Sequence, residues 1–178
     1  MTDTIATGPG FAGAFAEIDP DQPDYDRIRD IAATMVPFGN HAGVRVTELG
    51  PDQAVAEIPD EPHLCNHLNT VHAGALFLAA DIAGAAAFAG AAAAKLRSVR
   101  WFVLREARTS FRKPATGRIR VVATVDERAM RAVLAATAEQ RVDVDGKALL
   151  YNVDGALVAR VSFEYVCEIA GPPARQEP

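Results

Sequence analysis

The chain has 178 residues, of which 49% are hydrophobic, so it is long and apolar enough for one domain with a substantial core. Its formal net charge of −5 argues against a general nucleic-acid binder. The two cysteines, Cys65 and Cys167, provide neither a disulfide framework nor the paired spacing of a metal site. The first residues lack the basic start and the apolar run of a signal peptide, and we therefore expect a cytoplasmic protein.

The N-terminal part of the chain changes character near residue 24. Residues 1–23 are interrupted by glycine and proline, so we expect a flexible arm, although Phe11 and Phe15 are able to dock on a core. Residues 24–36 place apolar side chains at helical spacing, with acids in the first turn and Pro37 at the end. This pattern predicts a short amphipathic helix.

A strand pair and a long apolar helix are expected next. Residues 43–59 alternate apolar and polar side chains on both sides of a Gly50-Pro51-Asp52 turn. Residues 63–96 begin as a loop rich in His and Asn and continue as an alanine-rich helix with one acid, Asp81. Alanine and glycine contribute little transfer energy, and the acid lies near the middle of the apolar run. We therefore expect a helix buried within protein and no contact with a membrane.

Strand patterns dominate the second half of the chain. They cover residues 98–113, 118–126, 148–153 and 156–169. A helix is expected over residues 126–140, where acids begin a run rich in Ala, Leu and Met. Asp145-Gly146 predicts a turn, and Asp154-Gly155 predicts the hairpin that joins the last two strands. Residues 171–178 are expected to be a disordered tail.

The order of these elements favours an α+β fold, with an antiparallel sheet wrapped around a long central helix. Such a sheet solves the burial problem of the apolar helix within a single domain over residues 24–170. One face of the helix would remain uncovered, however. We therefore expect a homodimer or a dimer of dimers.

The spacing of two residues on the apolar helix points to chemistry. A helix that begins near Ala73 presents free N–H groups and its positive dipole end at Gly74, where they are able to hold a developing oxyanion. Asp81 lies seven residues beyond Gly74, which is about 10 Å along a helix. An attacking group and an oxyanion donor must both lie about 3 Å from one carbonyl, so one straight helix cannot provide both. Two antiparallel helices across a two-fold axis can, and the spacing predicts that Gly74 of one subunit faces Asp81 of the other.

The same stretch resembles a known family. Residues 66–77, NHLNTVHAGALF, followed by Asp81, resemble the hotdog-fold acyl-CoA thioesterases of the phenylacetate-degradation type, in particular members with the signature N-H-x-G-T-V-H-A-G-A-L-F. In that family a His-Gly-Gly or His-Ala-Gly turn opens the central helix. An acid follows nine residues after the His, and an Asn or Gln lies six residues before it. His72, Asp81 and Asn66 keep these intervals, and the resemblance extends over residues 37–169.

The resemblance implies the hotdog fold and the hydrolysis of a thioester. Asp81 would be the nucleophile or the general base that activates water, and the Gly74 N–H would polarise the thioester carbonyl. Asn66 and His72 would help to position the carbonyl or the water. Burial among apolar side chains should raise the pKa of Asp81, which favours the base, but both roles stay open.

Coenzyme A is, by this resemblance, part of an acyl-CoA substrate, and no cofactor or metal is expected. The candidate substrate-binding residues are Thr70, Phe77, Arg112 and Lys113. Arg112 and Lys113 would meet the phosphates of coenzyme A, or simply form a solvated strand end. Phe77 belongs to the core, to the ligand site, or to both. Asn69 stands where the signature has Gly, and Asn tolerates a left-handed conformation.

Three alternatives compete with the thioesterase hypothesis. Asp81 alone could be a structural acid paired with a strand arginine, but its interval from His72 favours function. A non-catalytic hotdog module would bind acyl-CoA as a sensor, yet such a sensor usually has an effector domain, for which 178 residues leave no room. A hydratase of the same fold would need a Gly-Asp-x-Asn-Pro motif before a His, and the sequence has none.

Overall fold

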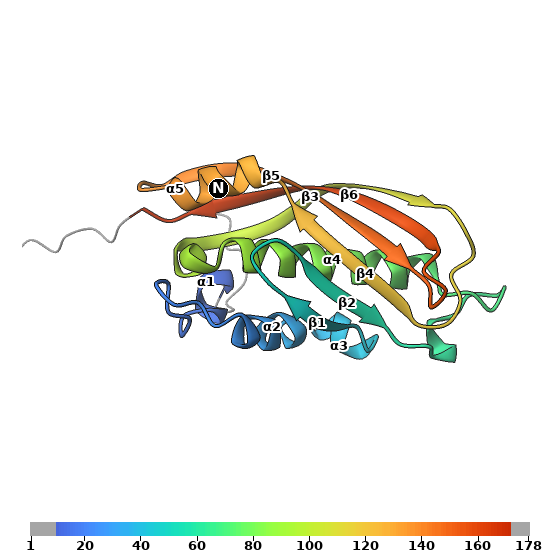
Figure 1. Cartoon of the computed structure of the whole chain (residues 1–178). Helices are drawn as coiled ribbons and strands as arrows, with labels where there is room; N and C mark the ends of the chain where they lie inside the picture. Colours follow the sequence, from blue (N-terminus) through green and yellow to red (C-terminus); the bar gives the residue numbers. More distant parts are fainter. Residues whose placement is uncertain (1–9, 172–178) are drawn as a thin grey trace, which may run out of the picture.

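Six antiparallel strands form one curved sheet that wraps around a single long helix (Figure 1). The structure is a computed structural model and describes residues 10–171. The strands, in chain order, are β1 (Arg45–Leu49), β2 (Ala54–Ile58), β3 (Val99–Phe111), β4 (Ile119–Val125), β5 (Gln140–Tyr151) and β6 (Leu157–Ile169). Their order in the sheet is β1-β2-β4-β5-β6-β3. The predicted α+β fold class, an antiparallel sheet around a central helix, is confirmed.

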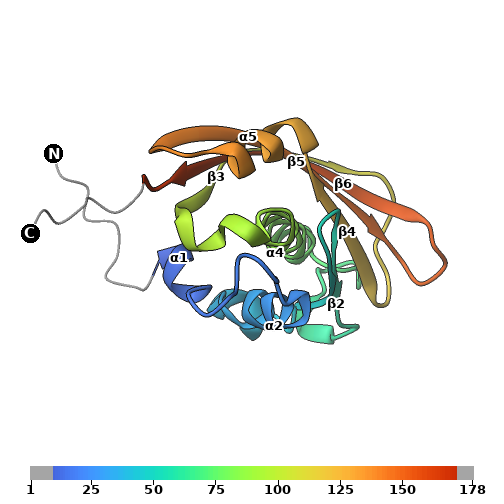
Figure 2. The ribbon, with the colours of Figure 1, turned by 60° about the vertical axis from the view of Figure 1, so that its left-hand side comes forward.

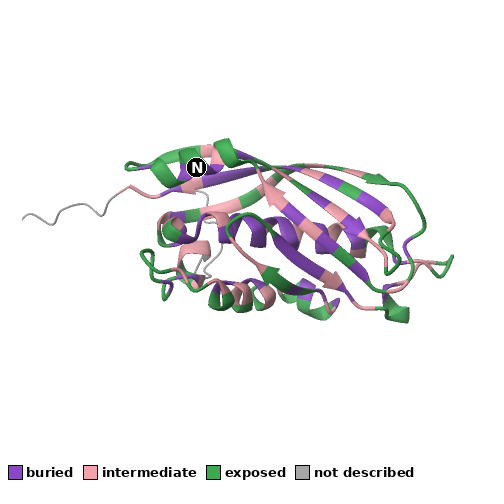
Figure 3. Ribbon diagram, in the orientation of Figure 1, coloured by how far each residue is buried: buried purple, intermediate pink, exposed green. Residues whose placement is uncertain are grey.

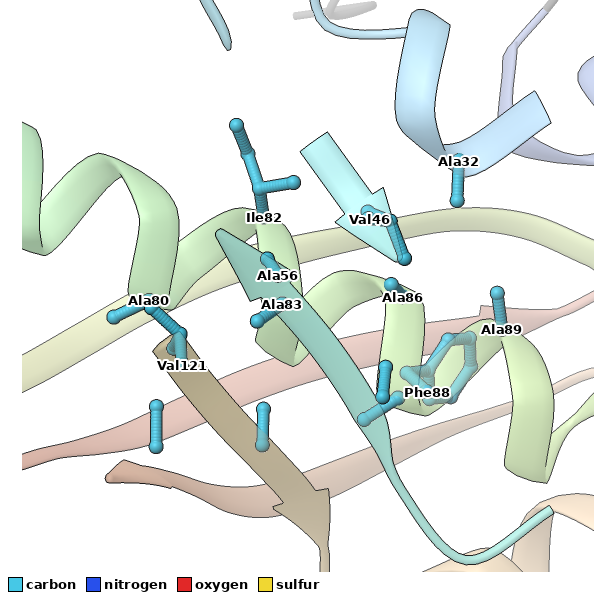
Figure 4. Close-up of a cluster of buried hydrophobic side chains, with 14 of the residues drawn as sticks. Ala32, Val46, Ala56, Ala80, Ile82, Ala83, Ala86, Phe88, Ala89 and Val121 are labelled. Carbon is cyan, nitrogen blue, oxygen red and sulfur yellow. The ribbon is translucent and has the colours of Figure 1, made fainter. Parts of the chain in front are cut away.

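The central helix is α4 (Ala73–Ala91), which continues into the 3-10 turn η2 (Ala93–Ser98). Figure 2 looks nearly along its axis, with the sheet on two sides and a shorter helix, α2 (Tyr25–Thr34), on a third. Its buried side chains are mostly alanines, and Figure 4 shows Ala83 and Ala86 among side chains from the neighbouring strands. Short side chains let these elements approach the helix backbone closely.

By length and composition alone, α4 could cross a membrane, but 61% of its apolar window is buried inside the protein. The sequence pattern had predicted a helix buried within protein, and this is where the helix lies.

The predicted amphipathic helix over residues 24–36 is observed as α2. Asp24 caps it, because its side chain accepts a hydrogen bond from the Arg27 N–H at 3.0 Å. Ile28 and Ala32 form its buried face. Pro37 does not lead into a loop but begins a second short helix, α3 (Pro37–His41), since proline is well accommodated in the first helical turn.

The prediction of a flexible arm over residues 1–23 is wrong for much of its described part. Residues Gly10–Ala14 form a short helix, α1, and Phe15 is fully buried. The ring of Phe11 lies 5.8 Å from that of Phe88 on α4, so the two phenylalanines anchor this segment to the core. The first nine residues of the predicted arm lie outside the described residues. So do residues 172–178 of the predicted tail.

The turn predicted at Asp145-Gly146 is also wrong. Both residues lie inside β5, where Gly146 pairs with Val125 on one side and Phe163 on the other. A Cβ at Gly146 would lie 3.3 Å from the ring of Tyr165, so the glycine provides space for an aromatic side chain and does not mark a turn. The helix expected before β5 is present as α5 (Glu127–Ala135).

The hairpin predicted at Asp154-Gly155 is confirmed. Gly155 has a positive φ of 74°, and its N–H donates to the Asn152 carbonyl at 3.0 Å.

Two regions are only partly covered by the described residues, the outer edge of β3 and one stripe of α4 (Figure 3). The 13-residue strand β3 ends the sheet order, so one of its edges has no neighbouring strand within residues 10–171, and Val103 on it is 47% exposed. On α4, one stripe is only half-buried while the other faces are covered. The members of this stripe are Phe77, Leu78, Asp81 and Ala85.

Replacing Gly90 by Ala should destabilise the fold by about 2 kcal/mol, because overpacking a tight contact outweighs the helix propensity gained. The new Cβ would lie 2.2 Å from the backbone carbonyl oxygen of Gly50, which is not free to move away. Urea denaturation measures the loss. Gly50→Ala is the matched control, since a Cβ there meets nothing within 4 Å, and it should change stability by less than about 0.5 kcal/mol. Equal stabilities of the two variants would contradict this packing account.

Candidate active site

The loop before α4 is organised by Asn66. Its side-chain oxygen accepts hydrogen bonds from the backbone N–H groups of Leu68 at 2.8 Å and Thr70 at 3.3 Å. Its amide nitrogen donates to the Thr70 hydroxyl at 2.9 Å. Asn69 takes the left-handed conformation, with φ 56°, in the place where the family signature has Gly. Asn66 and Thr70 therefore hold the loop in this structure, through bonds to each other and to the backbone.

Two backbone hydrogen bonds fix the point at which α4 begins. The Val71 N–H donates to the Ala115 carbonyl at 2.8 Å, which ties the loop to the connection between β3 and β4. The His72 N–H donates to the Leu64 carbonyl at 2.8 Å, in the segment that begins with the 3-10 turn η1 (Pro62–Leu64). These anchors leave His72 at the N-cap position, with the helix starting at Ala73.

His72 caps the helix through its ring. Its Nδ1 accepts a hydrogen bond from the Gly74 N–H at 2.9 Å. The N–H that the sequence predicts as an oxyanion donor therefore already has an acceptor, and a substrate oxygen would have to replace the imidazole nitrogen. His72, Ala73 and Gly74 are all exposed, so the exchange requires only rotation of the His72 ring.

Asp81 lies on the half-buried stripe of α4, two turns after Gly74. Desolvation raises the pKa of its carboxyl above the ordinary value of 3.8, and a hydrogen bond from Tyr165 acts in the opposite direction. The Tyr165 hydroxyl lies 3.5 Å from Oδ1 of Asp81. Among the described residues, no arginine pairs with this acid, so the alternative of a structural Asp–Arg pair is not what the structure contains.

Sequence reasoning missed Tyr165. It lies on β6 and is only 1% exposed, and burial raises the pKa of its hydroxyl far above the ordinary value, with the charge of Asp81 adding to the effect. It remains protonated and acts as a donor. The available signal was the alternation Val161, Phe163, Tyr165 on one face of a strand, since a buried tyrosine hydroxyl needs a polar partner.

One chain does not bring all of the predicted site residues together. Gly74 and Asp81 share one face of α4 but are about 10 Å apart along it. Phe77 lies between them on the same stripe and is half-buried. Arg112 and Lys113 are exposed just after β3, and their backbone N–H groups bond to the Val158 carbonyl at 2.8 and 3.3 Å.

The connection that contains Arg112 and Lys113 adjoins the loop of Asn66 through the bond between Val71 and Ala115. Both cations therefore belong to the end of the molecule at which α4 begins. Within residues 10–171, neither is engaged in an ion pair.

A hollow in the described part of the chain lies elsewhere. It has a volume of about 1190 Å³ and lies between α5 and residues of β3, β5 and β6, with both acids and bases in its wall. None of the predicted site residues lines it. Within residues 10–171, no three His, Cys, Asp or Glu side chains lie together in a way that could hold a metal ion.

The chain is similar to a protein family and to several solved structures. The family model described as "Domain of unknown function (DUF4442)" matches residues 26–166. No curated protein matches the sequence. A solved structure from Pseudomonas aeruginosa, described as a protein of unknown function and probable thioesterase, is 25% identical with a TM-score of 0.62, covering 82% of this chain and 96% of that chain.

Two further solved structures are similar. One, from Shewanella oneidensis and related to the thioesterase superfamily, is 18% identical with a TM-score of 0.63, covering 83% of this chain and 95% of that one. The other, a thioesterase family protein from Silicibacter pomeroyi, is 18% identical with a TM-score of 0.60, covering 83% of this chain and all of that one. These neighbours are thioesterase-superfamily proteins, and the hotdog fold expected from the sequence is confirmed.

Proposed function

The chain belongs to the family described as "Domain of unknown function (DUF4442)", and from this premise we propose that it is an acyl-CoA thioesterase. It would hydrolyse a thioester to a carboxylic acid and free coenzyme A. The observation that carries the proposal is the single acid of α4, Asp81, which lies half-buried on the same uncovered stripe as the exposed Gly74 end of the helix. The chain itself covers this acid only in part, and in our proposal a second chain covers the remainder.

The site is proposed to form between two chains. When two α4 helices run antiparallel across a two-fold axis, the separation of about 10 Å between Gly74 and Asp81 on each helix places Gly74 of one against Asp81 of the other. The edge of β3 that no strand of residues 10–171 pairs with would continue the sheet into the second copy. The half-buried apolar residues Phe77 and Leu78 then become covered, and Phe77 lines the acyl group.

The chemistry requires little machinery. With Asp81 as base, its carboxylate takes a proton from water while the water oxygen attacks the thioester carbonyl carbon. The Gly74 N–H of the partner chain donates a hydrogen bond to the negatively charged carbonyl oxygen. To do so, this N–H gives up its hydrogen bond to His72 Nδ1. The C–S bond then breaks, and the coenzyme A thiolate leaves and is protonated. With Asp81 as nucleophile, the carboxylate forms an anhydride that water hydrolyses, and the donors keep their places.

The surroundings support these roles. The raised pKa of Asp81 brings a carboxylate closer to the range in which general bases are effective at neutral pH. Asn66 holds the loop that presents His72 and so acts on the site through the backbone. Arg112 and Lys113, exposed near the start of α4, are the candidates for the phosphates of coenzyme A.

Thiol release from a panel of acyl-CoAs of increasing chain length tests the proposal. The wild type should release free coenzyme A from at least one of them with saturation kinetics. The same acyl groups presented on an acyl carrier protein show which carrier the enzyme uses. Tight calorimetric binding of acyl-CoAs without any turnover would instead identify a non-catalytic acyl-CoA-binding protein. That alternative takes some support from the Gly74 N–H, which is occupied in this structure.

A further inference from the structure

We propose that Tyr165 is a positioning residue for Asp81: its hydroxyl holds Oδ1 of the carboxylate from the sheet side, so that Oδ2 is left for water and substrate. The inference rests on the proposed function, in which Asp81 is the reacting carboxylate. The two groups lie on different elements, β6 and α4, and their contact of 3.5 Å is the only side-chain hydrogen bond that Asp81 accepts within the described residues.

The Tyr165 ring is held rigidly. It stacks on Phe102 of β3, with ring centroids 4.5 Å apart, and Phe102 stacks in turn on Phe88 of α4 at 3.8 Å. Phe163 lies on the other side at 5.2 Å. A fully buried ring in such a stack has little freedom to rotate, so the direction of the hydroxyl is set by the core.

Two glycines provide the space for this ring. A Cβ at Gly84, three residues after Asp81 on α4, would lie only 2.1 Å from the Tyr165 hydroxyl oxygen. A Cβ at Gly146 on β5 would lie 3.3 Å from the ring. Alanine would suit the helix better at position 84, since glycine is among the least favourable residues in a helix interior. The Tyr165 hydroxyl therefore explains why position 84 is glycine. The hydroxyl can reach the helix backbone beside Asp81 only because Gly84 has no side chain.

Tyr165 is the titratable group that faces Asp81. No other acid or base lies on α4, and the charged side chains on the strands around it are exposed or paired with one another, as Arg105 is with Asp143 and Glu164. On the helical side of α4, Arg29 is paired with Asp26 and Asp30, and Lys95 donates to the Ala136 carbonyl at 3.0 Å. Burial keeps Tyr165 protonated, so it donates to Asp81 and does not compete for the proton.

A contact of 3.5 Å is longer than the O–H···O bonds of about 2.7 Å that are usual in proteins. Catalytic hydrogen bonds are often long in the absence of ligand and tighten in the complex. The hydroxyl stabilises the charged form of Asp81, and its removal therefore raises the carboxyl pKa further.

Tyr165→Phe tests the inference with two readouts. First, the acid limb of the pH profile of kcat/KM should move to higher pH, so that activity on that limb falls about tenfold, as expected for a lost hydrogen bond to a charged group. KM at the pH optimum should change little. Phe15→Leu is the packing control: it removes a fully buried ring whose printed aromatic contact is with Phe11 and not with Tyr165, and it should lower the thermal midpoint while leaving the acid limb in place.

Second, the Asp81 carboxyl should titrate at higher pH in Tyr165→Phe than in the wild type, followed by NMR on protein with ¹³C-labelled aspartate. Gly84→Ala, which pushes the hydroxyl away, should move the titration in the same direction. This readout needs no turnover. An unchanged titration in both variants overturns the inference, even if the wild type is an active thioesterase. A shifted titration upholds it, even if no thioester is hydrolysed and the proposed function fails.

Discussion

Asp81→Asn is expected to lower kcat for thioester hydrolysis by about 10³-fold or more, with little change in KM. Asn keeps the size of the side chain and still accepts a hydrogen bond from Tyr165, so the local structure should remain. It can neither take a proton from water nor attack a carbonyl carbon. Steady-state thiol release over a range of substrate concentrations separates the two kinetic constants. Equal rates for both proteins would remove Asp81 from the mechanism.

The same substitution should stabilise the fold at neutral pH. Burial raises the pKa of Asp81 above 3.8, so the folded chain binds this proton more tightly than the unfolded chain does. Below the pKa of the unfolded chain the carboxyl is neutral in both states and does not lower the free energy of unfolding. As the pH rises through the folded pKa, the charge must be held half-buried, and stability is lost. Asn has no charge to bury, and its advantage should be present at pH 7 and absent below pH 3.8.

Urea denaturation at several pH values measures this difference. Asp60→Asn is the matched control, because Asp60 is exposed and the described residues give it neither a hydrogen bond nor an ion pair. Its stability should follow that of the wild type at every pH. A stability gain for Asp81→Asn that persists unchanged in acid would show that packing, and not the buried charge, is responsible. Stability gained where activity is lost is the usual relation at a functional site.

The sequence was sufficient for the fold because periodicity and turn residues act locally. The alternation of residues 43–59 and the Asp154-Gly155 turn specify hairpins through short-range geometry, and both are present. The alanine-rich run specifies a helix with no polar face, and a curved sheet is the arrangement that covers it.

Glycine was the main source of error. At Gly155 it provides a positive φ, whereas at Gly146 and Gly84 it provides room for one aromatic ring. A glycine that provides a positive φ and a glycine that makes space look the same in the sequence. Only the packing partner, Tyr165, distinguishes them. Tyr165 lies on another element, so the sequence pattern around each glycine does not predict this contact.

The positions of the candidate residues relative to α4 were predictable, but their hydrogen bonds were not. His72, Gly74 and Asp81 fall where the spacing places them on α4. The spacing does not reveal that the imidazole of His72 occupies the Gly74 N–H, because the choice of acceptor depends on a side-chain rotamer. Nor does it reveal the full burial of Phe15, which lies beside side chains of α2 and α4.

Mixing two inactive variants should restore activity if the site forms between chains. Gly74→Pro removes the proposed oxyanion donor while proline remains acceptable in the first helical turn, and activity should fall by about 10²–10³-fold. Gly74→Ala is its matched control, since it keeps the N–H, and the new Cβ meets only the His72 ring, at 3.1 Å from Nδ1. Full activity in Gly74→Pro would show that this N–H is not the donor.

The decisive measurement combines Gly74→Pro with Asp81→Asn after subunit exchange at equal concentration. A mixed dimer contains one site with Asp81 and Gly74 both intact, contributed by different chains, and one site with both altered. Random exchange makes half of the dimers mixed, so about a quarter of the wild-type activity should return. If Asp81 and Gly74 of the same chain served one carbonyl, every site would contain one altered residue and no activity would return. The recovered fraction thus distinguishes a site shared between two chains from a site within one chain. Gly74 and Asp81 of one helix are about 10 Å apart, so they cannot both contact one carbonyl.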